Sequence, residues 1–121
     1  MKIAVTAKGN NLGAEVDPRF GRCLYLLIVN SETMEFEALE NEGAMAMGGA
    51  GPQTAQAISQ RGAEVVITGN VGPNAIQALN AAGIKVLTGA SGSVKEVIEK
   101  YKNENLDETK TATVGSHAGM R

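Results

Sequence analysis

The sequence predicts an α/β domain with a mixed five-stranded sheet and helices on its faces. An apolar run at residues 24–29 is followed, after a short turn, by strict alternation at residues 34–38, which is typical of an antiparallel hairpin. Val-Ile-Thr-Gly-x-x-Gly at residues 66–72 then recurs as Val-Leu-Thr-Gly-x-x-Gly at residues 86–92. This repeat indicates successive βα units, and therefore a parallel second half of the sheet with right-handed crossovers.

Three strands are expected in the N-terminal half. Residues 3–6 form a short apolar strand, and the polar, glycine-bearing residues 8–16 predict a loop. The run at 24–29 predicts a strand that is buried on both faces. Residues 30–33 are a turn, and the alternation at 34–38 predicts a half-buried strand.

The C-terminal half alternates helices with strands. Helices are expected at residues 52–61, 73–82 and 93–102, and the strands between them at 64–67 and 84–87. Pro52 suits a first helical position, and Gly62 and Gly83 suit the residue past a helix end. Ser93 and Glu96 form a capping box that starts the third helix.

Size and composition limit the function. The chain has 121 residues, which is one domain, predicted here at residues 1–106 with a flexible polar tail at 107–121. A net charge of −2 and 3% aromatic residues argue against nucleic-acid binding. A single cysteine, and no apolar run near the roughly 20 residues that cross a bilayer, favour a cytoplasmic protein with no membrane contact.

Residues 17–23, Asp-Pro-Arg-Phe-Gly-Arg-Cys, combine two arginines with the only cysteine. Arg19 and Arg22 can clamp an anion by charge-assisted hydrogen bonds, or they are solvated or paired with the neighbouring carboxylates. Glycine loops at 48–51, 69–72 and 89–92 each precede a helix. Their backbone N–H groups can hold an anion, although short helix-entry loops also need glycine.

Cys23 is either a soft metal ligand or a small buried apolar residue. Met45 and Met47 are thioethers that can bind a soft metal or cover the edge of the core. His117 lies in the predicted tail. One thiolate cannot build an iron–sulfur cluster, which typically takes four, so Cys23 can only help to hold a preformed one.

Catalysis has little support in the sequence. The chain has one histidine and two aspartates, too few for a hydrolytic triad or a two-metal nuclease centre. No glycine loop fits the patterns that bind nucleotide phosphates. We therefore expect a protein that is not an enzyme and has no catalytic residues.

Four features follow one another along the chain: the 17–23 segment, the Gly49-Ala50-Gly51 loop, the Val66-Ile67-Thr68-Gly69-x-x-Gly72 strand and loop, and a final helix ending at Tyr101. In this order they resemble the dinitrogenase iron–molybdenum cofactor biosynthesis family. This is the NifX and NifB C-terminal type of domain, and the resemblance covers residues 1–106. It implies an RNase H-like fold and the carriage of anionic metal–sulfur clusters. These clusters are iron–molybdenum cofactor precursors or, in related small proteins, a molybdenum–copper sulfide. Many members carry histidine before the Phe-Gly pair, where this chain has Arg19.

The resemblance and the residues together predict a small non-enzymatic carrier, a monomer or weak homodimer. It would hold an iron–molybdenum or other metal–sulfur cluster transiently and exchange it with an assembly or acceptor protein. The expected cofactor-binding residues are Arg19, Phe20, Gly21, Arg22, Gly48, Gly49 and Gly51, with Cys23 touching metal. A module for a phosphate-bearing small molecule or nucleotide is the alternative, and a nuclease has only fold analogy behind it.

Overall fold

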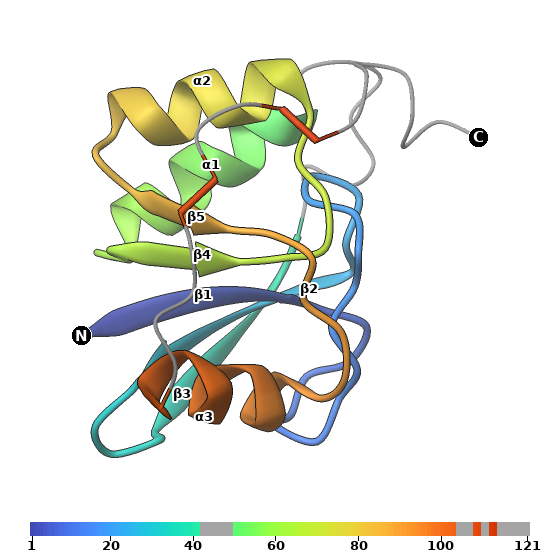
Figure 1. Cartoon of the computed structure of the whole chain (residues 1–121), viewed down its shortest axis with the longest axis vertical. Helices are drawn as coiled ribbons and strands as arrows, with labels where there is room; N and C mark the ends of the chain where they lie inside the picture. Colours follow the sequence, from blue (N-terminus) through green and yellow to red (C-terminus); the bar gives the residue numbers. More distant parts are fainter. Residues whose placement is uncertain (42–49, 104–107, 110–111, 114–121) are drawn as a thin grey trace.

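The computed structural model describes residues 1–41, 50–103, 108–109 and 112–113. Its elements are β1 (Lys2–Ala7), β2 (Tyr25–Asn30), β3 (Phe36–Glu40), α1 (Ala50–Gln60), β4 (Val65–Ile67), α2 (Pro73–Ala81), β5 (Lys85–Leu87) and α3 (Val94–Asn103). The five strands form one sheet in the order β3-β2-β1-β4-β5 (Figure 1).

The sheet is mixed, as the sequence predicts. β1 lies at its centre and pairs antiparallel with β2 on one side and parallel with β4 on the other. β3 extends the antiparallel side and β5 the parallel side. The more specific RNase H-like assignment stays a prediction.

Two apolar layers sandwich the sheet. Helices α1 and α2 cover one face, and α3 covers the other (Figure 1). Ala4 of β1 packs in the layer that contains Ile58 of α1 and Leu79 of α2. Ile3 and Val5 point to the opposite layer with Ile98 of α3, so the period-2 alternation of β1 feeds both layers.

The third strand is the main correction to the predicted elements. Residues 34–38 are expected to be a half-buried strand, but β3 begins at Phe36 and is mostly exposed. Met34 instead lies in the turn, with a φ of 64°. β3 is the last strand of the sheet and has one neighbour, so alternation in its sequence does not lead to burial.

Helix boundaries follow their signals with one exception. Helix α2 begins at Pro73 and is followed by Gly83 with a φ of 73°. At the start of α3, the N–H of Ser93 donates to Glu96 and the N–H of Glu96 donates to the Ser93 hydroxyl, both at 3.1 Å. These bonds confirm the capping box, and the hydrogen bond from the Ser93 N–H to the Glu96 carboxylate lowers the pKa of Glu96.

Helix α1 is the exception, because it begins at Ala50. Pro52 is therefore its third residue, and its predicted place as the first is wrong. Proline is tolerated there because the first-turn N–H groups of a helix have no intrahelical partner.

Part of the predicted tail contacts the domain. The N–H of Thr109 donates to the Val86 carbonyl at 2.6 Å, and the hydroxyls of Thr88 and Thr109 lie 2.7 Å apart. Thr113 exchanges backbone and hydroxyl hydrogen bonds with Val71. The boundary at residue 106 and the flexibility of the tail stay predictions. Within the described residues, no helix is long and apolar enough to cross a membrane.

Candidate anion-binding site

Segment 17–23 crosses the carboxyl ends of the two central parallel strands. The N–H of Asp17 donates to the carbonyl of Thr6, at the end of β1, at 2.9 Å. After β4, the N–H of Asn70 donates to the Pro18 carbonyl at 2.8 Å, and the Asn70 carbonyl accepts from Phe20 at 3.3 Å. The segment is therefore fixed on both sides at the end of the sheet where α/β proteins usually bind ligands.

Two glycines allow this segment to lie close to its neighbours. A Cβ atom on Gly69 would lie 2.6 Å from the Pro18 Cα atom, so only glycine fits without a shift of the backbone. Gly21 has a φ of 82°, and the N–H of Arg22 donates to the Phe20 carbonyl at 2.7 Å, which closes a tight three-residue turn.

The turn at Gly21 lies against the start of α1. A Cβ atom on Gly21 would lie 3.0 Å from the backbone nitrogen of Gly51, and one on Gly51 would lie 2.8 Å from the Ala75 Cβ atom in α2. Both helices begin at the same end of the molecule as segment 17–23 (Figure 1). The positive ends of two helix dipoles therefore face the region around Gly21 and Gly51, two of the predicted binding residues.

Arg19 is held by the buried carboxylate of Asp17, whose side chain is 1% exposed. One carboxylate oxygen accepts the Arg19 backbone N–H at 3.0 Å and its Nε at 3.3 Å, and the other lies 3.4 Å from the guanidinium Nη2. The hydrogen bond and charge of Asp17 raise the pKa of Arg19. The Arg19 side chain is still 53% exposed, so the guanidinium is oriented and accessible to a ligand.

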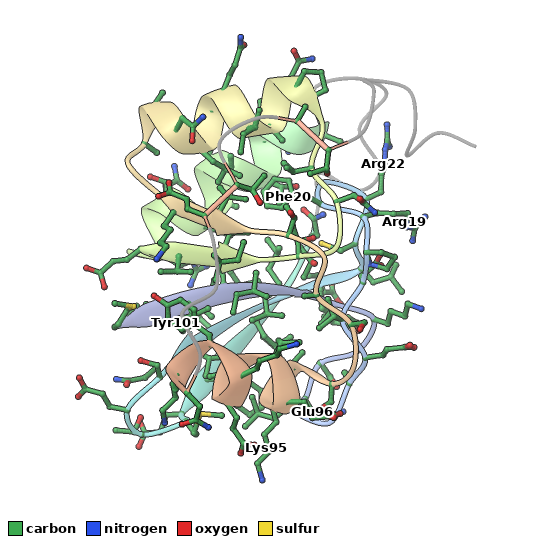
Figure 2. All side chains as sticks on the ribbon, viewed as in Figure 1. Arg19, Phe20, Arg22, Lys95, Glu96 and Tyr101 are labelled. Carbon is green, nitrogen blue, oxygen red and sulfur yellow. The ribbon has the colours of Figure 1, made fainter. Side chains whose placement is uncertain are left out.

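Phe20 and Arg22 occupy opposite environments. Phe20 is 6% exposed and packs into the layer under α1 and α2, where it anchors the turn. Arg22 is half-buried, and its side chain extends from the same side of the molecule as that of Arg19 (Figure 2). The structure thus brings two arginines, one tight turn and the start of α1 together.

Asn41, which directly follows β3, stabilises the same segment through its side-chain amide. Its Nδ2 donates to the carbonyls of Gly21 at 3.1 Å and Cys23 at 3.0 Å. Its Oδ1 accepts the hydroxyl of Thr54 in α1 at 3.0 Å. One buried amide therefore joins the turn, β3 and α1.

Cys23 is fully buried within this network and is a free thiol. Burial, followed by the charge of Asp17, raises the pKa of Cys23 to about 12. A thiol of this kind stays protonated at neutral pH, whereas a metal ligand is the thiolate. The prediction that Cys23 contacts metal stays a prediction, and it requires the side chain to leave the core.

The remaining residues that the sequence singled out cannot be placed relative to this segment. Gly48 and Gly49, together with Met45, Met47 and His117, lie outside the described residues. Among the residues that the structure describes, no group of three or more His, Cys, Asp or Glu side chains is arranged to hold a metal ion.

Sequence reasoning named Asp17 only as one possible partner of the arginines, and it missed the contacts of Asn41 and Thr54. Asp17 directly precedes Pro18, and its side chain accepts the N–H two residues on, which is the Asx-turn signal that could have found it. The contacts of Asn41 span 13 to 20 residues of sequence, and a lone asparagine at a strand end carries no comparable signal.

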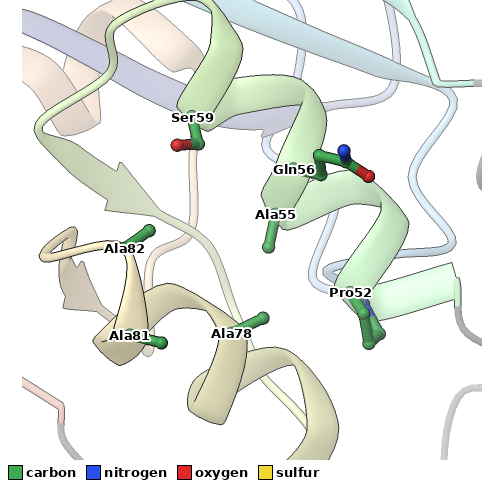
Figure 3. A pocket seen from close by; sticks show the side chains of 7 residues that line it. All are labelled: Pro52, Ala55, Gln56, Ser59, Ala78, Ala81 and Ala82. Atoms are coloured by element: carbon green, nitrogen blue, oxygen red, sulfur yellow. The ribbon is translucent and has the colours of Figure 1, made fainter.

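A separate groove lies between α1 and α2, with a volume of about 300 Å³ (Figure 3). It is lined by uncharged side chains, mostly alanine, namely Pro52, Ala55, Gln56, Ser59, Ala78, Ala81 and Ala82. Those predicted binding residues that the structure describes do not line it.

The mixed five-stranded sheet and its three helices define a small α/β domain. A family model described as dinitrogenase iron-molybdenum cofactor matches residues 1–104, and the chain belongs to this family.

Two similar proteins of known structure share this fold over 93% of the chain. The apo form of the orange protein from Desulfovibrio gigas is 37% identical, with a TM-score of 0.90 over 93% of this chain and 96% of that one. A Thermotoga protein of the DUF35 family, solved by NMR, is 36% identical, with a TM-score of 0.80 over 93% and 97%. An uncharacterised protein of Methanocaldococcus jannaschii is 32% identical over 88% of this chain and 90% of its own length.

Proposed function

We propose that this protein is a non-enzymatic cytoplasmic carrier that binds an anionic metal–sulfur cluster, an iron–molybdenum cofactor precursor or a related molybdenum, iron or copper sulfide. The observation that carries the proposal is the pair Arg19 and Arg22, flanking a tight turn against the start of α1. Membership of the family described as dinitrogenase iron-molybdenum cofactor supports this class of cargo.

The physical fit depends on charge. Guanidinium groups and backbone N–H groups at helix starts bind anions without needing a cage of thiolates. Arg19 is held by Asp17, so little side-chain freedom is lost when it contacts a ligand. The cluster would bring its own sulfide, and the protein would supply positive charge, shape and release to an assembly or acceptor protein.

Anaerobic titration with tetrathiomolybdate and Cu(I), followed by absorption and by metal and sulfide analysis after gel filtration, tests this proposal. We expect near-stoichiometric retention by the wild type and at least a tenfold weaker binding by Arg19→Ala/Arg22→Ala. Arg61→Ala is the matched control, because Arg61 is an exposed arginine paired with Glu37 away from the site. Equal retention by the double variant would remove the site assignment.

A binding module for a phosphate-bearing small molecule or nucleotide is the second candidate. The burial of Cys23 favours it, because a buried and protonated thiol does not bind metal. The guanidinium and N–H donors that remain suit phosphate as well as sulfide. In that case inorganic phosphate or ATP would raise the melting temperature without metal, Cys23→Ser would keep the effect, and tetrathiomolybdate would not be retained.

A further inference from the structure

The two edges of the sheet differ in how the chain covers them. At the β5 edge, the Val86 carbonyl accepts the N–H of Thr109 from the C-terminal segment. β3 forms the opposite edge and pairs only with β2 among the described strands (Figure 1). An edge strand without a neighbour presents a row of hydrogen-bonding groups to any extended chain.

The register identifies the groups on this edge. The carbonyl of Glu35 accepts the N–H of Asn30, and the N–H of Asn41 donates to Leu24, so odd-numbered residues bond to the β2 side. Because bonding alternates along an antiparallel strand, Phe36, Ala38 and Glu40 direct their N–H and C=O groups away from β2. In the part of the chain that the structure describes, these groups have no hydrogen-bond partner.

The side chains next to this edge are exposed and of two kinds. Phe36 and Ala38 pair with Val29 and Leu27, which belong to the apolar layer under α3, yet Phe36 is 41% exposed. On the opposite face, Glu37 is exposed and forms a 2.7 Å ion pair with Arg61. One face of the edge therefore carries Phe36 and Ala38, with Glu40 at its end, and the other face carries Glu35 and Glu37.

Charge decides which extended chain fits. Residues 31–40 contain four glutamates, Glu32, Glu35, Glu37 and Glu40, and neither lysine nor arginine. All four are exposed. A second copy of this chain would bring four more glutamates to the same edge, which disfavours self-pairing, whereas a basic strand would be attracted.

We propose that the open edge of β3 binds an extended basic segment of a partner protein, which adds to the sheet as a sixth strand. Backbone groups of Phe36, Ala38 and Glu40 would supply the main-chain hydrogen bonds. Lysine or arginine side chains of the partner would lie beside Glu35 and Glu37, and an apolar side chain would cover Phe36. This surface is separate from the arginine site and does not depend on the proposed cargo.

The test uses the full chain and a synthetic peptide of alternating valine and lysine, labelled for fluorescence anisotropy. A peptide of alternating valine and glutamate is the control for charge, and a proline-interrupted version of the basic peptide is the control for strand pairing. We expect binding of the basic peptide only, weakening with salt, together with slower hydrogen exchange at the amides of Phe36, Ala38 and Glu40.

Two variants make the test specific. Ala38→Pro removes one outward N–H at a position where an edge strand tolerates proline, and we expect at least a tenfold loss of peptide binding. Glu35→Lys/Glu37→Lys keeps the backbone groups and should reverse the preference toward the acidic peptide. Arg19→Ala/Arg22→Ala should bind the basic peptide like the wild type, which separates this surface from the proposed carrier function.

Equal binding of both peptides, or equal binding by Ala38→Pro with an unchanged circular dichroism spectrum, would overturn the proposal. A wild-type dimer in sedimentation that Ala38→Pro converts to monomer would also overturn it, because a second copy would then occupy the edge.

Discussion

Segment 17–23 and the groove between α1 and α2 both border the same pair of helices, but they differ in chemistry. The segment is fixed by backbone hydrogen bonds to Thr6 and Asn70 and by buried polar side chains, and it presents two arginines. The groove has a volume of about 300 Å³, and alanine and other uncharged residues line it. The two surfaces therefore make opposite predictions: the segment offers oriented positive groups for an anion, and the groove offers an uncharged hollow.

Gly69→Ala should break the segment most severely. The new Cβ atom would meet Pro18 at 2.6 Å, so the backbone must move, and we expect a loss of about 2–3 kcal/mol in the free energy of unfolding. Gly72→Ala is the control, because no atom lies within 4 Å of its Cβ position. Urea unfolding of both variants measures the difference, and equal losses would contradict the close approach to Pro18.

Asp17→Asn should release Arg19. Loss of a buried charged acceptor is expected to lower stability by about 1.5–3 kcal/mol and to weaken cluster retention, because the guanidinium is no longer oriented. The exposed pair gives the control, since Glu37→Gln should cost at most about 1 kcal/mol and leave retention unchanged. Unfolding curves and the tetrathiomolybdate titration measure the two effects.

Cys23 should make the protein sensitive to alkali. Its pKa in the folded state, about 12, lies above the ordinary value of 9.0, so the unfolded thiol ionises first as the pH rises. The contribution of the protonated Cys23 thiol to the free energy of unfolding is fully present below pH 9. It is lost between about pH 9 and 12, at about 1.4 kcal/mol per pH unit. Unfolding of Cys23→Ala should show a profile flatter by this slope, and parallel profiles would mean that the thiol is not buried.

Changes in the groove should have the smallest effect. Gln56→Ala removes the longest polar side chain of the lining, and we expect stability within about 0.5 kcal/mol of the wild type. Cluster retention should not change. A clear loss of retention would move the site from segment 17–23 to the groove.

Local signals predicted the parts of the fold that local chemistry determines. The hairpin, the βα repeat, the capping box of α3 and the end of α2 at Gly83 need only neighbouring residues. The exposure of β3 depends on its place at the edge of the sheet, which alternation in its own sequence does not encode.

The candidate site likewise has residues that the sequence could predict and residues that it could not. Arg19, Gly21 and Arg22 stand out because they lie within four residues of each other. Asn41 reaches Gly21 across 20 residues, and Gly69 meets Pro18 across 51, so both roles depend on the folded topology. The burial of Cys23 follows from the same long-range packing, and sequence alone left its role open between a ligand and a core residue.

The most direct test of the account is to map the ligand on the backbone by NMR. Amide resonances would be followed while tetrathiomolybdate with Cu(I), and separately inorganic phosphate, is added anaerobically to the full chain. We predict saturable shifts at residues 19–23 and at Gly51, and none at Ala55, Ser59 or Ala81. Shifts confined to the groove, with residues 19–23 unchanged, would contradict it.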